Sequence, residues 1–585
     1  MNNRLIHKMF YSTMIVQLCS MLIQVFAVFV DGAVIGGCLG ASSLASYGFA
    51  IPVATVFSGI ATVFSAGISG LCGRAIARGD KEEANRIFSQ GVWAALIVSI
   101  TLLLFCFWGA DWLAAILGAG SDLEKETAAY IRGYVLCAPA LMMLLVLMPI
   151  MQIDSDKTRI IKAVCIMTGI NVSLDLVAGL ILHKDLFYIA LCTTIAYYAG
   201  SLVLLMHFGK SSSMFRLPIA RSIPKLQSVM ELISYGLPDA LQKISRSFLN
   251  ICLNHILLIT GGAFAVSAFS AVYSASLLCM ILGSCIGDSI YVMNSLLAGE
   301  KDTESMKIML RTALKTALLL NAALSVIVFA TAPVFMRLFF NSDESAFQIA
   351  VTGFKIYSLS IVFYSLNVVW RTYYQSMHLL KIAHSYVVLN NFCFIALSAY
   401  VLSRFFGTSG VWYSFLAGQV LTLLFIMLLN LPRIRRAGAL DGMMRLPADF
   451  ASEIVSSYSW SAHTLNEIMQ VSESVGRICK AERVSSRISF ILSLMVEEIA
   501  VNIYTYGFAE KKTHSIDVKL QHLNDGWLIR IRDDCRLFDP TRYVALYDYS
   551  SPEEHIGIRM VKKLASRIEY TSALKLNNLL ITLDI

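Results

Sequence analysis

The feature that most constrains this chain is a series of apolar segments, each about 20 residues long, separated by short polar breaks. An apolar helix of that length spans the hydrocarbon core of a bilayer. Hydrophobic residues make up 57% of the chain and charged residues only 15%, which excludes an ordinary soluble protein. Twelve transmembrane helices are therefore predicted before residue 432, at 10–36, 44–73, 88–110, 129–152, 159–182, 187–209, 230–260, 267–298, 309–332, 348–375, 381–404 and 409–431.

The breaks between these segments carry Lys and Arg unevenly. Every second break is rich in cations, as at Arg74, Arg78 and Lys81, whereas the alternate breaks hold few. Loops on the cytoplasmic side of membrane proteins carry an excess of Lys and Arg. The pattern predicts a multi-pass protein of the plasma (inner) membrane with both termini in the cytoplasm. It also accounts for the net charge of +8, so the lipid bilayer is the expected partner and nucleic acid is not.

The chain contains an internal repeat. Residues 39–50 resemble residues 260–271, and glycine landmarks recur at the same offset of about 221 residues. Each half then holds six spans, and because six is even both halves enter the membrane from the same side. The fold class expected is an all-α polytopic membrane protein with two parallel six-helix lobes, at 1–220 and 221–432.

The last part of the chain has a different composition. Charged residues are about one in four after residue 440 and about one in nine before it. Residues 433–448 form a basic, proline-bounded segment, predicted to be a linker. Beyond it, helical periodicity alternates with strand-like patterns and an Asn-Asp-Gly turn, which predicts a soluble α/β sandwich over 449–585. The cysteines are scattered singly, so neither a disulfide framework nor a zinc site is expected.

Two carboxylates lie inside predicted membrane spans. Asp31 is in the first span, and Asp175 is in the fifth, beside Asn171. A charge at bilayer depth costs about 2.5–3.5 kcal/mol on insertion scales, so such residues are functional candidates. Two carboxylates and an amide in one lobe predict a proton or sodium site. The structural alternative is that they cap helices or bind backbone amides.

Several segments carry a family resemblance. VDGAVIGGCLGASSLASYGFAIP, NVSLDLVAGL and FFGTSGVWYSF resemble motifs of the multidrug and toxin extrusion (MATE) transporters. The resemblance covers about residues 5–432. It implies a proton- or sodium-coupled antiporter that exports drug-like or amphipathic small molecules by alternating access. Carried over by position, it makes Asp31, Asn171, Asp175 and Thr193 the cation site of the N-terminal lobe.

The chain departs from that family in its seventh span. GLPDALQKISRSFLN resembles the segment in which family members carry a Glu, but the matching position is Arg246. Cation coupling is therefore expected from the N-terminal lobe. The charged residues of the other lobe are expected to form an ion-pair cluster or a gate, which comprises Asp239, Lys243, Arg246 and Asp288.

The C-terminal segments 492–508, 532–540 and 555–570 resemble the N, G1 and G2 boxes of histidine-kinase-type (GHKL) ATPases, above all the anti-sigma-factor serine kinases. The resemblance implies four roles. Glu498 would orient water or a hydroxyl, and Asn502 would ligate magnesium. Asp533 would accept a hydrogen bond from adenine, and Gly557 would let the backbone approach phosphate.

The boxes are incomplete, because Cys535 replaces a glycine, Tyr506 replaces a frequent His and Gly557 stands alone in G2. Weak binding of Mg-ATP is the most that we expect from this domain, together with a regulatory role. The alternative is a domain that docks a cytoplasmic regulatory protein or the transporter itself.

Two other functions fit parts of the sequence. A flippase for lipid-linked precursors would use a cationic cavity, to which Lys243 and Arg246 could contribute. A membrane-anchored serine kinase would use the spans as a sensor. No G-x-x-x-x-G-K-[ST] loop is present in the sequence, so ATP is not expected to power transport.

Overall fold

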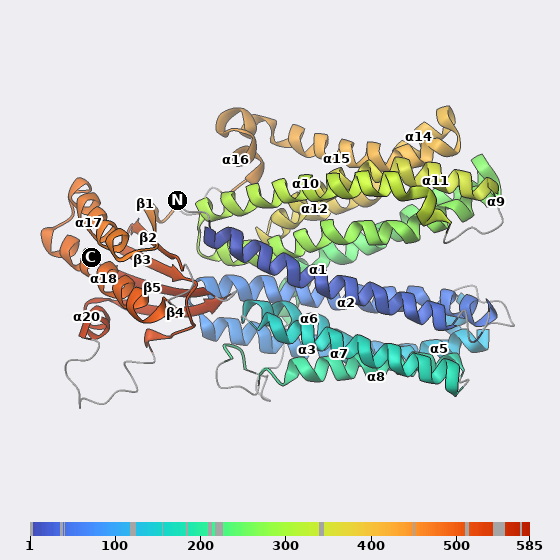
Figure 1. Cartoon of the computed structure of the whole chain (residues 1–585), viewed down its shortest axis with the longest axis horizontal. Coiled ribbons are helices and arrows are strands. Elements are labelled where there is room, and N and C mark those ends of the chain that lie inside the picture. The colour runs from blue at the N-terminus through green and yellow to red at the C-terminus, as the bar shows by residue number, and fades with distance from the viewer. Residues whose placement is uncertain are drawn as a thin grey trace.

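The computed structural model describes two helical bundles and an α/β domain at one end of them (Figure 1). The bundle coloured blue to teal lies beside the one coloured green to orange, and the N-terminus lies near the α/β domain. The residues described are 4–35, 39, 41–116, 124–154, 156–182, 185–208, 213–216, 226–337, 344–447, 450, 452–508, 514–541, 556–573 and 576–584.

The first bundle contains α1 (Arg4–Val34), α2 (Ala41–Ala77), α3 (Lys81–Trp108), α4 (Ala110–Ile116), α5 (Glu124–Val135), α6 (Ala138–Ile153), α7 (Lys157–Leu176), the π-helical turn η2 (Val177–Ile181) and α8 (Leu186–Leu205). The sequence sets where two of these helices begin. Asp80 accepts a hydrogen bond from the backbone N–H of Glu83, and Asp156 accepts one from Arg159. Both carboxylates satisfy N–H groups that the first helical turn leaves unpaired.

The second bundle contains α9 (Leu226–Gly299), α10 (Thr303–Met336), α11 (Glu344–Ser358), α12 (Ser360–Ser376), α13 (Leu380–Val388), the π-helical turn η3 (Leu389–Cys393), α14 (Phe394–Phe406), α15 (Thr408–Ala437) and α16 (Ala439–Met444). The long α9 is two helices, because Gly262 has φ 65° and breaks it. Asp302 caps α10, as Asp80 caps α3 in the first bundle.

The helical part has the character of a multi-pass membrane domain, as the sequence predicts. Among the described residues, nine helices are long and apolar enough to span a bilayer. The count rises to eleven if two bent pairs, α5 with α6 (47°) and α11 with α12 (44°), are each one span. One of the nine, α18 (Ser486–Gly507), belongs to the α/β domain. The number of twelve spans stays a prediction.

The segment predicted as a linker is mostly helical. Helix α15 continues to Ala437, and α16 follows after Gly438. The Tyr373 and Tyr374 hydroxyls of α12 donate to the backbone carbonyls of Met444 and Met443, at 3.0 and 2.8 Å. These bonds hold α16, which precedes the α/β domain in the chain, against α12 of the second bundle.

The two bundles meet where glycines let the backbones of α2 and α9 approach. A Cβ at Gly67 would lie 2.2 Å from the carbonyl oxygen of Leu232, and one at Gly236 would lie 1.9 Å from that of Val63. Small residues allow this kind of close packing between membrane helices. The contacts lie in the half of α2 that ends next to the α/β domain (Figure 1).

The α/β domain is a five-stranded antiparallel sheet packed against helices, with strand order β1-β2-β3-β5-β4. Val518, Ile531 and Ile581 from the sheet share one core with Val496 of α18. This confirms the predicted mixed α/β domain. Its elements are β1 (Ile454–Ala462), α17 (Leu465–Ala481), α18, β2 (Ile516–Leu523), β3 (Gly526–Asp533), α20 (Ile556–Leu564), β4 (Arg567–Ala573) and β5 (Leu576–Asp584).

Candidate functional site

The structure brings together the two carboxylates that the sequence places inside the membrane. Asn171 and Asp175 are one turn apart on α7, so they share a helix face. The Asn171 amide donates to Asp175 Oδ2 at 2.5 Å. Asp31, on α1, lies against both of them. The Asp175 side chain is fully buried, and Asp31 is 7% exposed.

Each carboxylate keeps one oxygen without a partner. Asp31 Oδ1 and Asp175 Oδ1 are buried and accept no hydrogen bond within the described part of the chain. A buried acceptor that stays unpaired is unfavourable, so two such oxygens at one place suit a cation or a shared proton. The π-helical turn η2 begins two residues after Asp175, and such turns are frequent at functional sites.

Thr193 is buried on α8, but its hydroxyl donates to the backbone carbonyl of Ile189 at 3.5 Å. Its neighbour Cys192 faces Asp175 instead. Tyr47 of α2 lies close to both carboxylates. The sequence reasoning missed Cys192 and Tyr47, because only the packing of α2 and α8 on α7 brings them to the site.

The structure shows partners for two of the four charged residues that are predicted to cluster in the second bundle. Lys243 donates to Ser58 Oγ of α2 at 2.7 Å, and therefore lies between the bundles. Arg246 points into the second bundle, where its nearest partners are the neutral side chains of Asn391 and Tyr364. Asp288 lies on the second half of α9, and the side chain of Asp239 is outside the described residues.

The α/β domain has a cavity of about 540 Å³ where the nucleotide-binding boxes were predicted. Asn502, Asp533 and Cys535 line it. Asp533 Oδ1 accepts hydrogen bonds from the Asn577 amide at 2.8 Å and from the Cys535 backbone N–H at 2.9 Å. Burial raises the pKa of Asp533 above its ordinary value. Ile499, Ile503, Tyr506, Gly507 and Ile558 also line the cavity.

Glu498 and Gly557 also meet beside this cavity. A Cβ at Gly557 would lie 1.9 Å from Glu498 Oε2, so the carboxylate approaches the first turn of α20 more closely than any side chain there would permit. The Asn502 amide donates to the backbone carbonyl of Glu498 at 2.7 Å. Its Oδ1 is the atom that can ligate magnesium, which prefers oxygen ligands.

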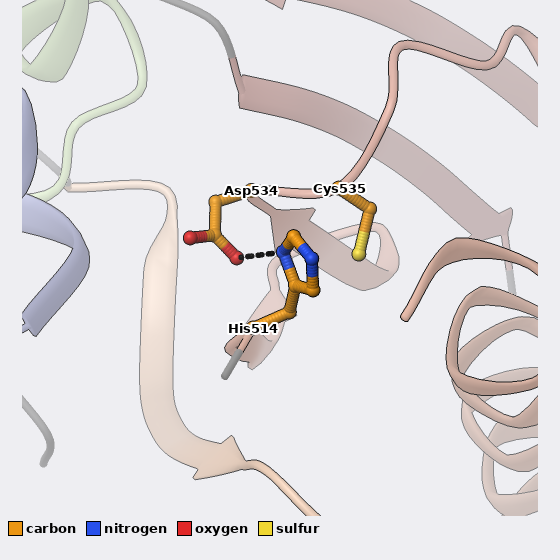
Figure 2. A group of neighbouring side chains, drawn as sticks. All are labelled: His514, Asp534 and Cys535. Carbon is orange, nitrogen blue, oxygen red and sulfur yellow. Dashed lines mark hydrogen bonds and ion pairs between the residues drawn. The ribbon is translucent and has the colours of Figure 1, made fainter. Parts of the chain in front are cut away.

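His514, Asp534 and Cys535 form a second group of metal-ligand type, with their ligand atoms within 4.8 Å of one another (Figure 2). His514 Nδ1 lies 3.2 Å from Asp534 Oδ1. Asp534 is already paired with the ammonium group of Lys8, and burial raises the pKa of the Cys535 thiol. This charge balance fits a docking contact with α1 better than a metal centre.

The α/β domain docks on the second bundle through buried ion pairs. Arg530 lies 2.5 Å from Asp302 and 2.7 Å from Glu300, and Lys519 lies 2.7 Å from Asp302. Arg532 also pairs with Glu300. Burial alone would raise the pKa of Asp302. The neighbouring cations Arg530 and Lys519 instead hold this pKa well below its ordinary range. Asp302 is only 1% exposed, so water does not screen these pairs.

The same domain also contacts the first bundle. Besides the pair of Lys8 with Asp534, Lys81 lies over the ring of Tyr570, 5.7 Å from its centroid. Gly79 lies so close to the Glu569 carboxylate that a Cβ there would not fit. The two capped turns, before α3 and before α10, therefore both touch the sheet (Figure 1).

Comparison with known sequences agrees with this architecture. The MatE family profile matches residues 18–177 and 238–402, and the profile of the histidine kinase-like ATPase domain matches residues 462–583. Multidrug export protein MepA of Staphylococcus saprophyticus is 22% identical over 67% of this chain and 86% of that protein. MepA of Staphylococcus aureus is 21% identical over 65% of this chain and 83% of that protein.

Solved structures show the same fold. A multidrug resistance MATE transporter in an outward-facing conformation superposes with a TM-score of 0.69 at 19% identity, covering 73% of this chain and 96% of its own. A transporter from Pyrococcus furiosus, described as having a binding pocket of reversed polarity, has the same score and coverage at 20% identity. Profile, relatives and fold agree. The chain thus belongs to the MatE family of membrane transporters, with a histidine kinase-like ATPase domain at residues 462–583.

Proposed function

We propose that this protein is a cation-coupled antiporter that exports drug-like or amphipathic small molecules by alternating access. The observation that carries the proposal is the pair of buried carboxylates, Asp31 and Asp175, each with one unpartnered oxygen. The multidrug export relatives support the same class of cargo. The ion gradient would supply about 2.3 kcal/mol per charge for each 100 mV, plus its concentration term.

The coupling step follows from the repulsion between the two carboxylates. A proton or a sodium ion between Asp31 and Asp175 neutralises that repulsion, and its release restores it. A change in charge at this depth alters the packing of α1 against α7. Rocking of one six-helix lobe against the other then exposes the central cavity to alternate sides of the membrane.

Sealed liposomes containing the full chain test this proposal. We expect a fluorescent amphipathic dye to move against its gradient when a proton or sodium gradient is imposed in the opposite direction. Collapsing that one gradient with an ionophore should stop the movement, which also identifies the coupling ion. Transfer of lipid-linked precursors without any ion dependence would favour the flippase alternative instead.

We assign the α/β domain a regulatory role on its contacts with both lobes. It touches the turn before α3 in the first lobe and the turn before α10 in the second. Those turns end the helices α2 and α9, whose close packing joins the lobes at this face. For the transporter to open at this face, the ends of α2 and α9 must move apart. A domain that is docked on both turns opposes that movement.

The nucleotide cavity and the docking surface share one strand. Arg530 and Arg532 of β3 pair with the second lobe, Asp533 lines the cavity, and Asp534 pairs with Lys8 of the first lobe. A nucleotide that moves the end of β3 would therefore disturb contacts with both lobes. This supports regulation by Mg-ATP rather than an ATP-driven pump.

Nucleotide binding is tested on the full chain in detergent with a fluorescent ATP analogue. We expect weak, magnesium-dependent binding that falls at least about tenfold in Asn502→Ala and Asp533→Ala, since these remove a metal ligand and the adenine acceptor. Gln470→Ala, on the exposed face of α17, is the matched control and should bind as the wild type does. Equal binding by the wild type and all three variants would refute the nucleotide site. If the wild type does not bind the analogue, the α/β domain acts only by docking on the two lobes.

A further inference from the structure

The second lobe carries an arginine at the place related by the internal repeat to the carboxylate site of the first lobe. Asn391 follows Asn171 by an offset of about 220 residues, and Ile395 follows Asp175 by the same offset. In the structure, Asn391 and Ile395 line one cavity together with Arg246. The carboxylates of the first lobe therefore have no counterpart at the matching positions of the second lobe, where a guanidinium from a different position lies nearby.

The partners of Arg246 are neutral. Its Nε donates to Asn391 Oδ1 at 3.2 Å, and its second terminal nitrogen donates to the Tyr364 hydroxyl at 3.0 Å. The guanidinium carbon also lies 5.6 Å from the centroid of the Tyr364 ring. No carboxylate pairs with Arg246 within the described part of the chain. A guanidinium inside a membrane domain without a counter-charge is strongly unfavourable, so the site lacks one negative charge.

A small cavity beside Arg246 has room for such a charge. The cavity measures about 40 Å³, which holds about three water-sized groups. Its wall is mostly apolar and aromatic. Amide and hydroxyl groups also line it, but the Ser276 and Ser360 hydroxyls and one N–H of Asn391 already donate to backbone carbonyls. These polar groups belong to Asn250, Tyr273, Ser276, Tyr357, Ser360, Tyr364, Asn391 and Gln419.

We propose that Arg246 marks an anion-binding site in the second lobe, which takes a small monovalent anion of carboxylate or halide type. A guanidinium pairs with a carboxylate through two parallel hydrogen bonds, and it attracts a halide through its charge. The anion is either the acidic group of an exported molecule or a free ion. Only the first source rests on the proposed export function, since anion binding itself does not require transport.

This site is an alternative to the ion-pair cluster that the sequence predicts around Arg246. The two explanations differ in what happens when the charge is removed. If a carboxylate paired with Arg246, Arg246→Met would leave that carboxylate buried without a partner and would lower the melting temperature sharply. If the partner is a dissociable anion, Arg246→Met removes an uncompensated charge, so the variant is at least as stable as the wild type without the anion.

The first experiment measures melting temperatures of the purified full chain in detergent at constant ionic strength. Sodium chloride and sodium acetate are compared with sodium gluconate, whose polyhydroxylated chain the mostly apolar wall of the cavity disfavours. We expect chloride or acetate to raise the wild-type melting temperature by about 3 °C over gluconate. Arg246→Lys, which keeps the charge but loses the two parallel hydrogen bonds, should keep part of the shift, and Arg246→Met should lose it. Equal melting temperatures of the wild type in all three salts would overturn the proposal, as would a sharp loss of stability in Arg246→Met.

The second experiment identifies the source of the anion. Liposomes with the full chain are loaded with a rhodamine dye that has a free carboxylate, or with the methyl ester of the same dye. If the cargo supplies the anion, Arg246→Met should slow export of the acid at least tenfold and that of the ester less than twofold. Equal effects on both dyes, with the chloride or acetate shift intact, assign the site to a free ion. Failure of the wild type to export either dye would count against the antiporter, while the melting experiment would still decide the anion site.

Discussion

Asp31→Asn and Asp175→Asn together are expected to abolish gradient-driven export, with a loss of at least about 100-fold relative to the wild type. An amide cannot take up and release a proton, and it lacks the charge that balances a bound sodium ion. Each single variant should already lose most of the coupling, because the two side chains meet at one site with Asn171. The rate of dye export from liposomes under the coupling gradient measures the effect.

The control is Asp185→Asn, a carboxylate in the same lobe that is exposed before α8 and makes no capping bond. It should transport as the wild type does, and all variants should elute as folded protein in detergent. Undiminished transport by the double variant would show that the coupling ion binds elsewhere. Thr193→Val should reduce export only slightly, because the Thr193 hydroxyl already donates to the backbone carbonyl of Ile189.

Glu300→Lys is expected to release the α/β domain from the second lobe and to speed transport. The new ammonium would lie against Arg530 and Arg532 where a carboxylate now pairs with both. Breaking a buried pair in this way costs about 3–5 kcal/mol, which lowers the docked population by a factor on the order of 100 or more. The side of the two lobes that the docked α/β domain holds closed would then open more often.

Hydrogen exchange of residues 567–584, the strands β4 and β5, reports undocking, and dye export reports the rate. Lys301→Ala is the matched control, because Lys301 lies in the same turn but pairs with Glu453 at the surface. An exposed pair contributes about 0–1 kcal/mol, so little change is expected. Adding Arg532→Glu to Glu300→Lys should restore docking. Unchanged exchange and transport in Glu300→Lys would refute the regulatory role.

The membrane domain could be predicted from the sequence because the bilayer leaves few solutions. Backbone groups in lipid must be paired within each segment, so long apolar segments become helices. The cost of charge at that depth also made Asp31 and Asp175 candidates for the coupling site. Cys192 and Tyr47 could not be found in this way. Neither residue type is unusual in a membrane helix, and only helix packing brings them to the carboxylates.

The docking surface could not be predicted, because the same sequence pattern occurs in strands that face solvent and in strands that face another domain. Arg530 and Arg532 alternate with buried apolar residues on β3, which is what a solvent-facing side of a sheet also shows. The structure buries them against Glu300 and Asp302, more than 200 residues earlier in the chain. Contacts at such sequence separation leave no local periodicity. The ATPase-like domain could be predicted because the segments that resemble its boxes are short and local in the sequence.

The measurement that tests the central claim most directly compares two sources of energy in one preparation. The full chain is sealed in liposomes, and dye export is followed first under an imposed proton or sodium gradient without nucleotide. It is then followed with Mg-ATP at the face bearing the α/β domain while ionophores hold all gradients at zero. The account predicts export that follows the ion gradient, with ATP changing its rate and driving none by itself. Export that requires ATP hydrolysis and continues with the gradients collapsed would contradict it.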